Sequence, residues 1–330
     1  MSNIKKIISQ TLMDSIDDSE INYDENKDCF HSKNRKFEKI NNITDLFVSE
    51  KNSDKITIKQ ESFYEDIKFP NYNGLETYGD LLDKSNKQGH LASILDKYIA
   101  FNSKILEVGC GTGQLSLFLK RFNRIICGID LSIPSLTLAE EFRLRNQIEN
   151  VFFAKMNIFN LQFKNEIFDY VISNGVLHHT YNTEVAFSKI LKPLKKGGYV
   201  IIGLYHKYGR LYTNVRQKLI QNFGEGFKFL DKRTTDTKIS KEKRYAWLRD
   251  QYKNPHETSH TLNEVKGWFE KHNIEYISSI PFDKFDKDKN IFNCKNKNHK
   301  FLKLKEISLI FSLRQINEGG FFVIIGKKLI

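Results

Sequence analysis

The sequence predicts an α/β fold in which helices wind on both faces of a mainly parallel sheet. Short apolar segments alternate with longer amphipathic ones from residue 104 to residue 205, and this alternation is typical of βαβ units. A turn with three glycines follows the first apolar segment, and a Gly-Gly pair precedes the last one. The strands are expected at 104–108, 124–129, 151–155, 168–173 and 199–205, and the helices at 113–122, 134–146 and 182–192.

The glycine-rich turn carries the first functional signal. Residues 105–113 read Ile-Leu-Glu-Val-Gly-Cys-Gly-Thr-Gly, so an acidic residue near the end of a strand precedes glycines at alternate positions. Glycine lets the backbone turn sharply and approach a ligand where a Cβ atom would collide. The dinucleotide fingerprint needs its third glycine at position 114, which is Gln114 in this chain, so a nicotinamide oxidoreductase is disfavoured.

A second acidic residue, Asp130, lies seventeen residues after Gly113 and directly follows the strand expected at 124–129. Ligands of open α/β sheets bind at the carboxyl ends of the strands, where the strand order reverses. The carboxylate of Asp130 is therefore placed to accept hydrogen bonds from both hydroxyls of a ribose.

The turn, Asp130 and the ordered segments after them resemble the class I S-adenosylmethionine-dependent methyltransferases, from about Gly89 to Tyr205. The later features are similar to those of an uncharacterised bacterial group of methyltransferase domains. The resemblance implies a Rossmann-like sheet of seven strands, with the last two at 276–280 and 321–327 and the final strand antiparallel. It also implies S-adenosylmethionine as the cofactor and methyl transfer to an oxygen or nitrogen nucleophile. A catalytically silent binding module is the alternative, and a demonstrable methyl acceptor would separate the two.

The resemblance assigns residues near the ends of the first four strands to the cofactor. They are Glu107, Gly109, Cys110, Gly111, Gly113, Asp130, Leu131, Asn157, Ile158 and Asn174. It implies that Glu107 orients the glycine loop, that Asp130 holds the ribose and that Leu131 lies against the adenine. Asn157 stands where many relatives have an acid, and its amide can still hydrogen-bond the adenine edge without a charge.

Two histidines, His178 and His179, are candidates for the catalytic residue. They end the segment Asn174-Gly-Val-Leu-His-His, which matches the family's segment beneath the reactive sulfur. Methyl transfer needs an aligned nucleophile and the removal of its proton, and histidine titrates near neutral pH. One of the pair is a candidate general base. The alternatives are that both are structural residues at a helix start, or that no base is used.

An insertion at 206–260 stands where the family places elements that recognise the substrate. The tentative substrate residues leave the fifth strand or lie at the far end of the insertion. They are Tyr205, His206, Tyr208, Arg210, His256 and His260. Trp247 is expected to pack within this lid, because large aromatic side chains on a helix are usually buried.

His256 to His260 formally matches the zinc-protease pattern HExxH. That chemistry requires both histidines on one helical turn. Pro255 precedes the motif, and Thr261 to Glu264 has the pattern of a capping box that begins a helix afterwards. The motif is therefore expected in a loop, no metal site is predicted, and either histidine could serve as an alternative base.

The positive charge is concentrated outside the predicted cofactor core. The chain of 330 residues has a formal net charge of +12, and 206–260 holds 13 Lys and Arg against 6 Asp and Glu. A further 8 Lys against 2 Asp lie at 284–305. An anionic acceptor such as RNA, a phosphorylated lipid or a nucleotide-activated sugar is compatible with this distribution. A solvated lysine-rich surface is the alternative, and the acceptor is left open among small molecules, sugars, lipids and RNA.

The remaining features bound the location and the domains. The four cysteines form no CxxC pair, the N-terminus lacks a signal-peptide core, and the longest apolar run, near 199–205, is too short to span a bilayer. A cytoplasmic protein is expected. The predicted units are a polar arm or degenerate zinc-ribbon-like element at 1–60, a helical lead-in at 61–100, the cofactor core at 101–205, the insertion at 206–260 and the rest of the fold at 261–330, with a partly helical insertion at 281–320.

Overall fold

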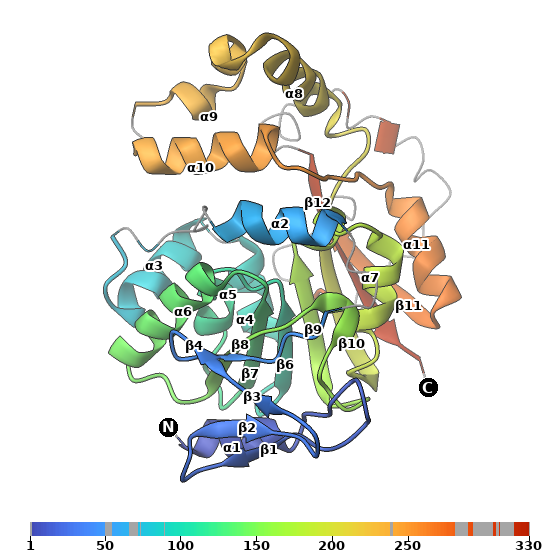
Figure 1. Cartoon of the computed structure of the whole chain (residues 1–330). Helices are drawn as coiled ribbons and strands as arrows, with labels where there is room; N and C mark the ends of the chain where they lie inside the picture. The colour runs from blue at the N-terminus through green and yellow to red at the C-terminus, as the bar shows by residue number, and fades with distance from the viewer. Residues whose placement is uncertain are drawn as a thin grey trace.

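A central sheet of nine strands organises the part of the chain that the computed structural model describes (Figure 1). The described residues are 2–49, 55–65, 72, 74–88, 90–237, 240–280, 290–292, 306, 307, 310 and 320–329. The strand order is β11-β12-β10-β9-β6-β7-β8-β5-β4. The helix expected within 302–314 therefore falls almost wholly outside the described residues.

Five parallel strands form the middle of the sheet. They are β6 (Lys104–Val108), β7 (Ile125–Asp130), β8 (Val151–Lys155), β9 (Phe168–Asn174) and β10 (Leu194–Tyr205). Their interior residues are buried on both faces of the sheet, as the runs of Val, Ile and Phe predict for parallel strands covered by helices. All five lie within a few residues of their predicted positions, and β10 begins earlier because the chain passes an irregularity between Leu194 and Tyr199 before its regular pairing.

The two last strands close one edge of the sheet in antiparallel fashion. β12 (Phe321–Lys328) lies between β10 and β11 (Ile274–Ile280) and runs antiparallel to both. The predicted mainly parallel, doubly wound sheet with an antiparallel last strand is thus confirmed.

The predicted number of seven strands is too low, because the N-terminal region adds two. β5 (Ile43–Asp45) pairs with β8 in parallel, and β4 (Lys39–Ile40) pairs with β5. These segments have two or three residues, too few to show an alternating pattern. Just before them, β1 (Asn22–Asp24), β2 (Cys29–His31) and β3 (Lys36–Phe37) form a separate small sheet beside α1 (Ser2–Ser9).

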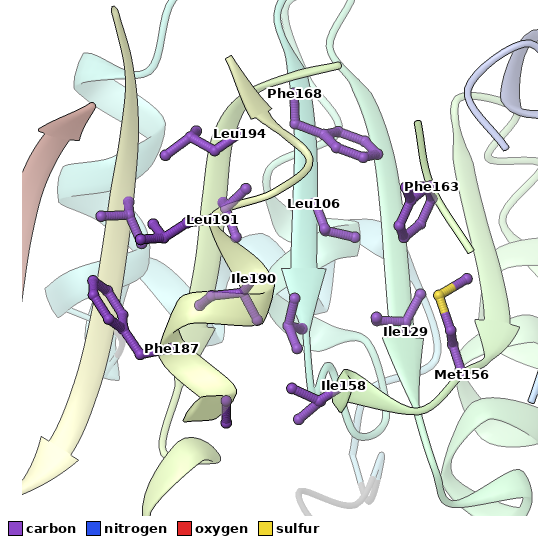
Figure 2. Packing of buried hydrophobic residues seen from close by; sticks show 14 of the residues in the cluster. Leu106, Ile129, Met156, Ile158, Phe163, Phe168, Phe187, Ile190, Leu191 and Leu194 are labelled. Atoms are coloured by element: carbon purple, nitrogen blue, oxygen red, sulfur yellow. The ribbon is translucent and has the colours of Figure 1, made fainter. Parts of the chain in front are cut away.

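Helices cover both faces of the central sheet. On one face α7 (Thr183–Ile190) and α11 (Leu262–Lys271) bury Phe187 and Trp268 in a cluster that also takes in the N-terminal Phe30. Figure 2 shows part of this cluster, with Phe187 and Ile190 of α7 and Leu106 and Ile129 of the sheet. The second cluster lies beneath α4 (His90–Tyr98), α5 (Gln114–Phe118) and α6 (Ile133–Arg145).

A helical layer stands over the carboxyl ends of the parallel strands. It consists of α8 (Leu211–Phe223), η3 (Glu225–Leu230), α9 (Lys232–Thr235) and α10 (Lys241–Tyr252). In Figure 1, α2 (Lys55–Glu65) runs between this layer and the core, and α3 (Tyr78–Gln88) lies at its side. The Gln60 amide of α2 donates to Asn254, and Arg249 of α10 lies over the Phe63 ring. Among the described residues, we find no helix with the length and apolar character that crossing a bilayer requires.

Candidate active site

A cavity of about 590 Å³ opens at the carboxyl ends of β6, β7 and β9. The strand order reverses between β6 and β9, because β7 and β8 follow on one side of β6 and β9 returns on the other. This is the position at which open α/β sheets bind ligands, and the volume is typical of small-molecule sites. The predicted cofactor residues that line the cavity are Glu107, Gly109, Cys110, Gly111, Asp130, Leu131, Asn157, Ile158 and Asn174.

The glycine turn has the close packing that its sequence predicts. Gly109 and Gly113 have φ values of +72° and +70°, in the left-handed region that glycine favours. A Cβ atom on Gly109 would collide with Val176, and one on Gly113 would collide with Phe153. The Gly109 and Cys110 amides both donate to the Ile129 carbonyl. Gly113, which does not line the cavity, therefore contributes by letting α5 begin against the sheet.

Asp130 is held by backbone amides at the edge of the cavity. One carboxylate oxygen accepts from the Gly111 amide at 2.8 Å, and the other accepts from the Ser132 amide at 2.9 Å. Burial raises the pKa of Asp130, while these hydrogen bonds act in the opposite direction. The Leu131 amide is a third donor to this carboxylate. A carboxylate has about four acceptor positions, so acceptor capacity remains for a ligand in the cavity.

Glu107 lies at the floor of the cavity and is only 6% exposed. The Ser116 hydroxyl donates to its carboxylate. Burial raises the pKa of Glu107 to about 7, because a buried charge lacks the solvation that water would provide.

The raised pKa makes the stability of the protein depend on pH. The folded state binds a proton at Glu107 more readily than the unfolded state, whose ordinary value is 4.5. The contribution of Glu107 to the free energy of unfolding is therefore largest below pH 4.5, and it falls by about 3 kcal/mol as the pH rises to about 7. Glu107→Gln should remove that loss. Relative to the wild type, the free energy of unfolding of the variant should therefore rise by about 3 kcal/mol between acid and neutral pH, as measured by urea titration. If the free energies of unfolding of the two proteins differ by the same amount at every pH, Glu107 does not have a raised pKa.

Asn157 lies at the cavity wall with both of its amide atoms hydrogen-bonded to the protein. Its oxygen accepts from the Phe159 amide at 3.0 Å and caps η1 (Ile158–Asn160), and its nitrogen donates to the Val48 carbonyl at 3.4 Å. The side chain therefore ties the β8 end to the N-terminal region.

The two candidate histidines occupy different environments. His179 lines the cavity, and its Nδ1 lies 3.1 Å from the His256 carbonyl oxygen. A carbonyl only accepts, so Nδ1 carries the proton and Nε2 is the basic nitrogen of neutral His179. His178 is fully buried outside the lining, and neither ring nitrogen has a hydrogen-bond partner among the described residues. Burial holds the pKa of His178 well below the ordinary value, so its ring is neutral.

Tyr205 is the one tentative substrate residue that lines the cavity among the described residues. Its hydroxyl accepts from the Gln251 amide at 2.7 Å, and the Arg210 guanidinium lies 3.5 Å from its ring centroid. Arg210 is fully buried, binds both Glu257 carboxylate oxygens and also donates to Gln251. Arg210 thus fastens the insertion to β10 from behind the cavity wall.

The other tentative substrate residues face protein partners outside the lining. His206 accepts from the Gly209 amide through Nδ1 and pairs with Glu306 through Nε2. Tyr208 lies beside the His206 ring. His256 supplies the carbonyl that anchors His179.

The HExxH segment lies in a loop, as its flanking residues predict. His260 hydrogen-bonds Glu264, Thr183 and Thr258. The capping box of Thr261 and Glu264 begins α11 directly afterwards. In the described part of the chain, no group of three or more His, Cys, Asp or Glu side chains is arranged to hold a metal ion.

The sequence does not predict several of the residues that line the cavity. Thr57, Gln60 and Tyr64 face the cavity from α2, and Trp247 and Gln251 face it from α10. The only local signal is their helical spacing, which places each set on one face of its helix. Trp247, expected to pack within the lid, lines the cavity, while its indole N–H donates to Asp231 at 3.0 Å.

Comparison with known proteins finds similarity to methyltransferases. A family model described as a methyltransferase domain matches residues 100–252. Phosphoethanolamine N-methyltransferase 2 of Caenorhabditis elegans is 33% identical over 129 residues, which are 37% of this chain and 30% of that protein. An uncharacterised protein of Methanocaldococcus jannaschii is 34% identical over 116 residues, which are 34% of this chain and 51% of that protein. The chain therefore spans about a third to a half of these curated relatives.

A solved structure supplies a comparison at the level of the fold. PKMT2 from Rickettsia typhi, in complex with AdoHcy, has a TM-score of 0.51 at 15% identity, over 72% of this chain and 52% of that one. Residues 100–252 of the chain therefore match a methyltransferase domain, and the chain shares its fold with PKMT2.

Proposed function

We propose that the cavity binds S-adenosylmethionine and that the protein transfers its methyl group to an oxygen or nitrogen nucleophile. The observation that carries the proposal is the meeting of the glycine turn with Asp130 in one cavity at the reversal of strand order. The acidic lining residues among those described are Glu107 and Asp130, which suits a cofactor with a sulfonium and an ammonium group.

The residues of the chain would bind the cofactor, orient the acceptor and remove the proton of its nucleophile. When bound, the cofactor supplies a methyl group already activated by a positive sulfur. Asp130 would accept the two ribose hydroxyls, and the backbone of Gly109 to Gly111 would lie along the methionine part. His179 would take the proton of the nucleophile at Nε2, because its Nδ1–H is held by the His256 carbonyl. The walls of the cavity would exclude water and hold the nucleophile in line.

Replacing Asp130 tests the cofactor assignment. Asp130→Ala should weaken S-adenosylmethionine binding by about 2–4 kcal/mol, or roughly 30- to 1,000-fold in Kd, through the loss of two charge-assisted hydrogen bonds. Calorimetric titration measures the change. Asp130→Asn is the matched control, because it keeps the size and one acceptor oxygen and should lose less. An unchanged affinity in Asp130→Ala would refute the ribose assignment.

A further inference from the structure

The loop between α10 and α11, residues 253–261, supplies the carbonyl that fixes the tautomer of His179. The His179 Nδ1 atom lies 3.1 Å from the His256 carbonyl oxygen. The side-chain amide of Gln60, on α2, donates to the same oxygen at 3.0 Å and to the side-chain oxygen of Asn254 at 2.8 Å. That Asn254 oxygen also accepts from the His256 backbone amide at 3.1 Å. Asn254 thus contacts both the residue that carries the carbonyl and the amide that bonds it.

The backbone is held on both sides of His256. On one side, the bond from the Asn254 side chain to the amide two residues later forms an Asx turn. Pro255, between these two residues, has a φ angle that its ring restricts. On the other side, the Thr258 amide donates to the His178 carbonyl at 2.8 Å. These contacts hold the His256 carbonyl in one orientation toward the His179 ring.

The contacts of Asn254 are buried and link the loop to α2. Asn254 and Gln60 are each only 6% exposed. Loss of a buried hydrogen bond leaves its partner unpaired, which costs more than the loss of an exposed one. The Asn254 amide nitrogen also donates to the Tyr64 hydroxyl at 3.1 Å, and the Tyr64 carbonyl accepts from the Ser132 hydroxyl at 3.1 Å. The helix that meets Asn254 is therefore itself fixed beside Asp130.

We propose that Asn254 is a positioning residue for His179, which it orients through the His256 carbonyl and the Gln60 amide. This inference rests on the proposed function, because it concerns the candidate base of the same cavity. Gln60 and Asn254 both lie outside residues 100–252, which match the methyltransferase domain. The base would therefore be oriented by parts of the chain that this match does not include.

The tautomer of His179 determines which ring nitrogen can act as the base. With the His256 carbonyl in place, Nδ1 carries the proton and Nε2 can take a proton from the nucleophile. The imidazolium that forms keeps the bond from Nδ1–H to the carbonyl. If the carbonyl moves away, the neutral ring can instead carry its proton on Nε2, and that form cannot accept a second proton there.

The tautomer can be measured without turnover. Nitrogen-15 NMR of protein labelled at its histidines distinguishes protonated from unprotonated ring nitrogens, at a mildly alkaline pH at which the ring is neutral. The chain has nine histidines, and His179→Ala identifies the signals of His179 by their loss. In the wild type, His179 should carry its proton on Nδ1.

Two replacements of similar size separate the polar contacts of Asn254 from its packing. Asn254→Leu removes both polar atoms, so the ratio of the Nδ1–H to the Nε2–H form should fall about fivefold, the effect of losing one ordinary hydrogen bond. Asn254→Asp keeps an oxygen that accepts from Gln60 and His256, so it should keep the wild-type ratio. If Asn254→Leu does not fold, Asn254→Ala replaces it, because the smaller side chain leaves space for water to pair the amides left behind.

Asn150→Ala is the control for a general loss of stability. The Asn150 amide donates to the Lys120 and Arg124 carbonyls. It lies just before β8, at the opposite end of the strands from the cavity, so this variant should leave the ratio unchanged. The inference is overturned if His179 keeps the wild-type ratio in folded Asn254→Leu or Asn254→Ala. It is also overturned if Asn254→Asp or Asn150→Ala lowers the ratio as much.

The NMR measurement also separates this inference from the proposed function. Failure of S-adenosylmethionine to bind would reject the proposed function, and the ratio of the two tautomers would still show whether Asn254 orients His179. An unchanged ratio in an Asn254→Leu protein that binds the cofactor would reject this inference alone.

Discussion

Replacing His179 with alanine should lower kcat by about 100- to 10,000-fold, the range that a positioned general base contributes. Affinity for S-adenosylmethionine should change little, because His179 is expected to act on the acceptor. The reason is structural: His179 lines the cavity, and the His256 carbonyl fixes its tautomer with Nε2 as the proton acceptor. Turnover is measured with the acceptor that a screen for transfer of an isotope-labelled methyl group identifies.

Chemical rescue distinguishes a base from a structural residue. Added imidazole should restore part of the kcat of His179→Ala, because it can occupy the vacated space and accept the proton. His178→Phe is the control, since His178 is buried, neutral and outside the cavity lining. It should keep most of the turnover. Wild-type turnover in His179→Ala would show that the protein needs no base at this position.

The second large effect is expected at the buried ion pair between Arg210 and Glu257. Glu257→Gln should lower the free energy of unfolding by about 3–5 kcal/mol, because it leaves a fully buried guanidinium without its counter-charge. Urea titration followed by circular dichroism measures the change. Loss of the pair also weakens one of the contacts that hold Arg210 beside Tyr205, while the hydrogen bond from Arg210 to Gln251 remains.

The double variant Arg210→Met, Glu257→Leu is the control for this pair. It removes both charges at once and fills the space with apolar side chains, so it should be much more stable than Glu257→Gln. If the single and double variants lose equal stability, packing rather than the unpaired charge determines the cost.

The central fold is predictable because its signals are local. Strands such as 104–108 and 168–174 are rich in β-branched, leucine and aromatic residues, and the glycines at 109–113 mark the turn between strand and helix. The edge strands β4 and β5 are not predictable in this way. Their two and three residues carry no periodicity, and their place in the sheet depends on pairing with β8, more than one hundred residues away.

The residues of the cavity also differ in how far local sequence predicts them. The predicted cofactor residues follow strand ends, so their convergence follows from the sheet itself. The part of the cavity wall formed by α2 and α10 depends on where these helices pack, which no local pattern specifies. The position of His206 and His260 in the chain predicts a substrate contact, but Glu306 and Glu264 hydrogen-bond their rings outside the cavity lining. Hydrogen-bond partners that lie far apart in the sequence cannot be predicted from local patterns.

Calorimetric titration of the wild-type protein with S-adenosylmethionine and with its demethylated product tests the central claim most directly. The account predicts that both bind at a single site with micromolar Kd, because both share the ribose and the methionine chain that the cavity is proposed to hold. Absence of heat for either ligand at millimolar concentration would contradict the claim, and a catalytically silent module would then be the better description of the chain.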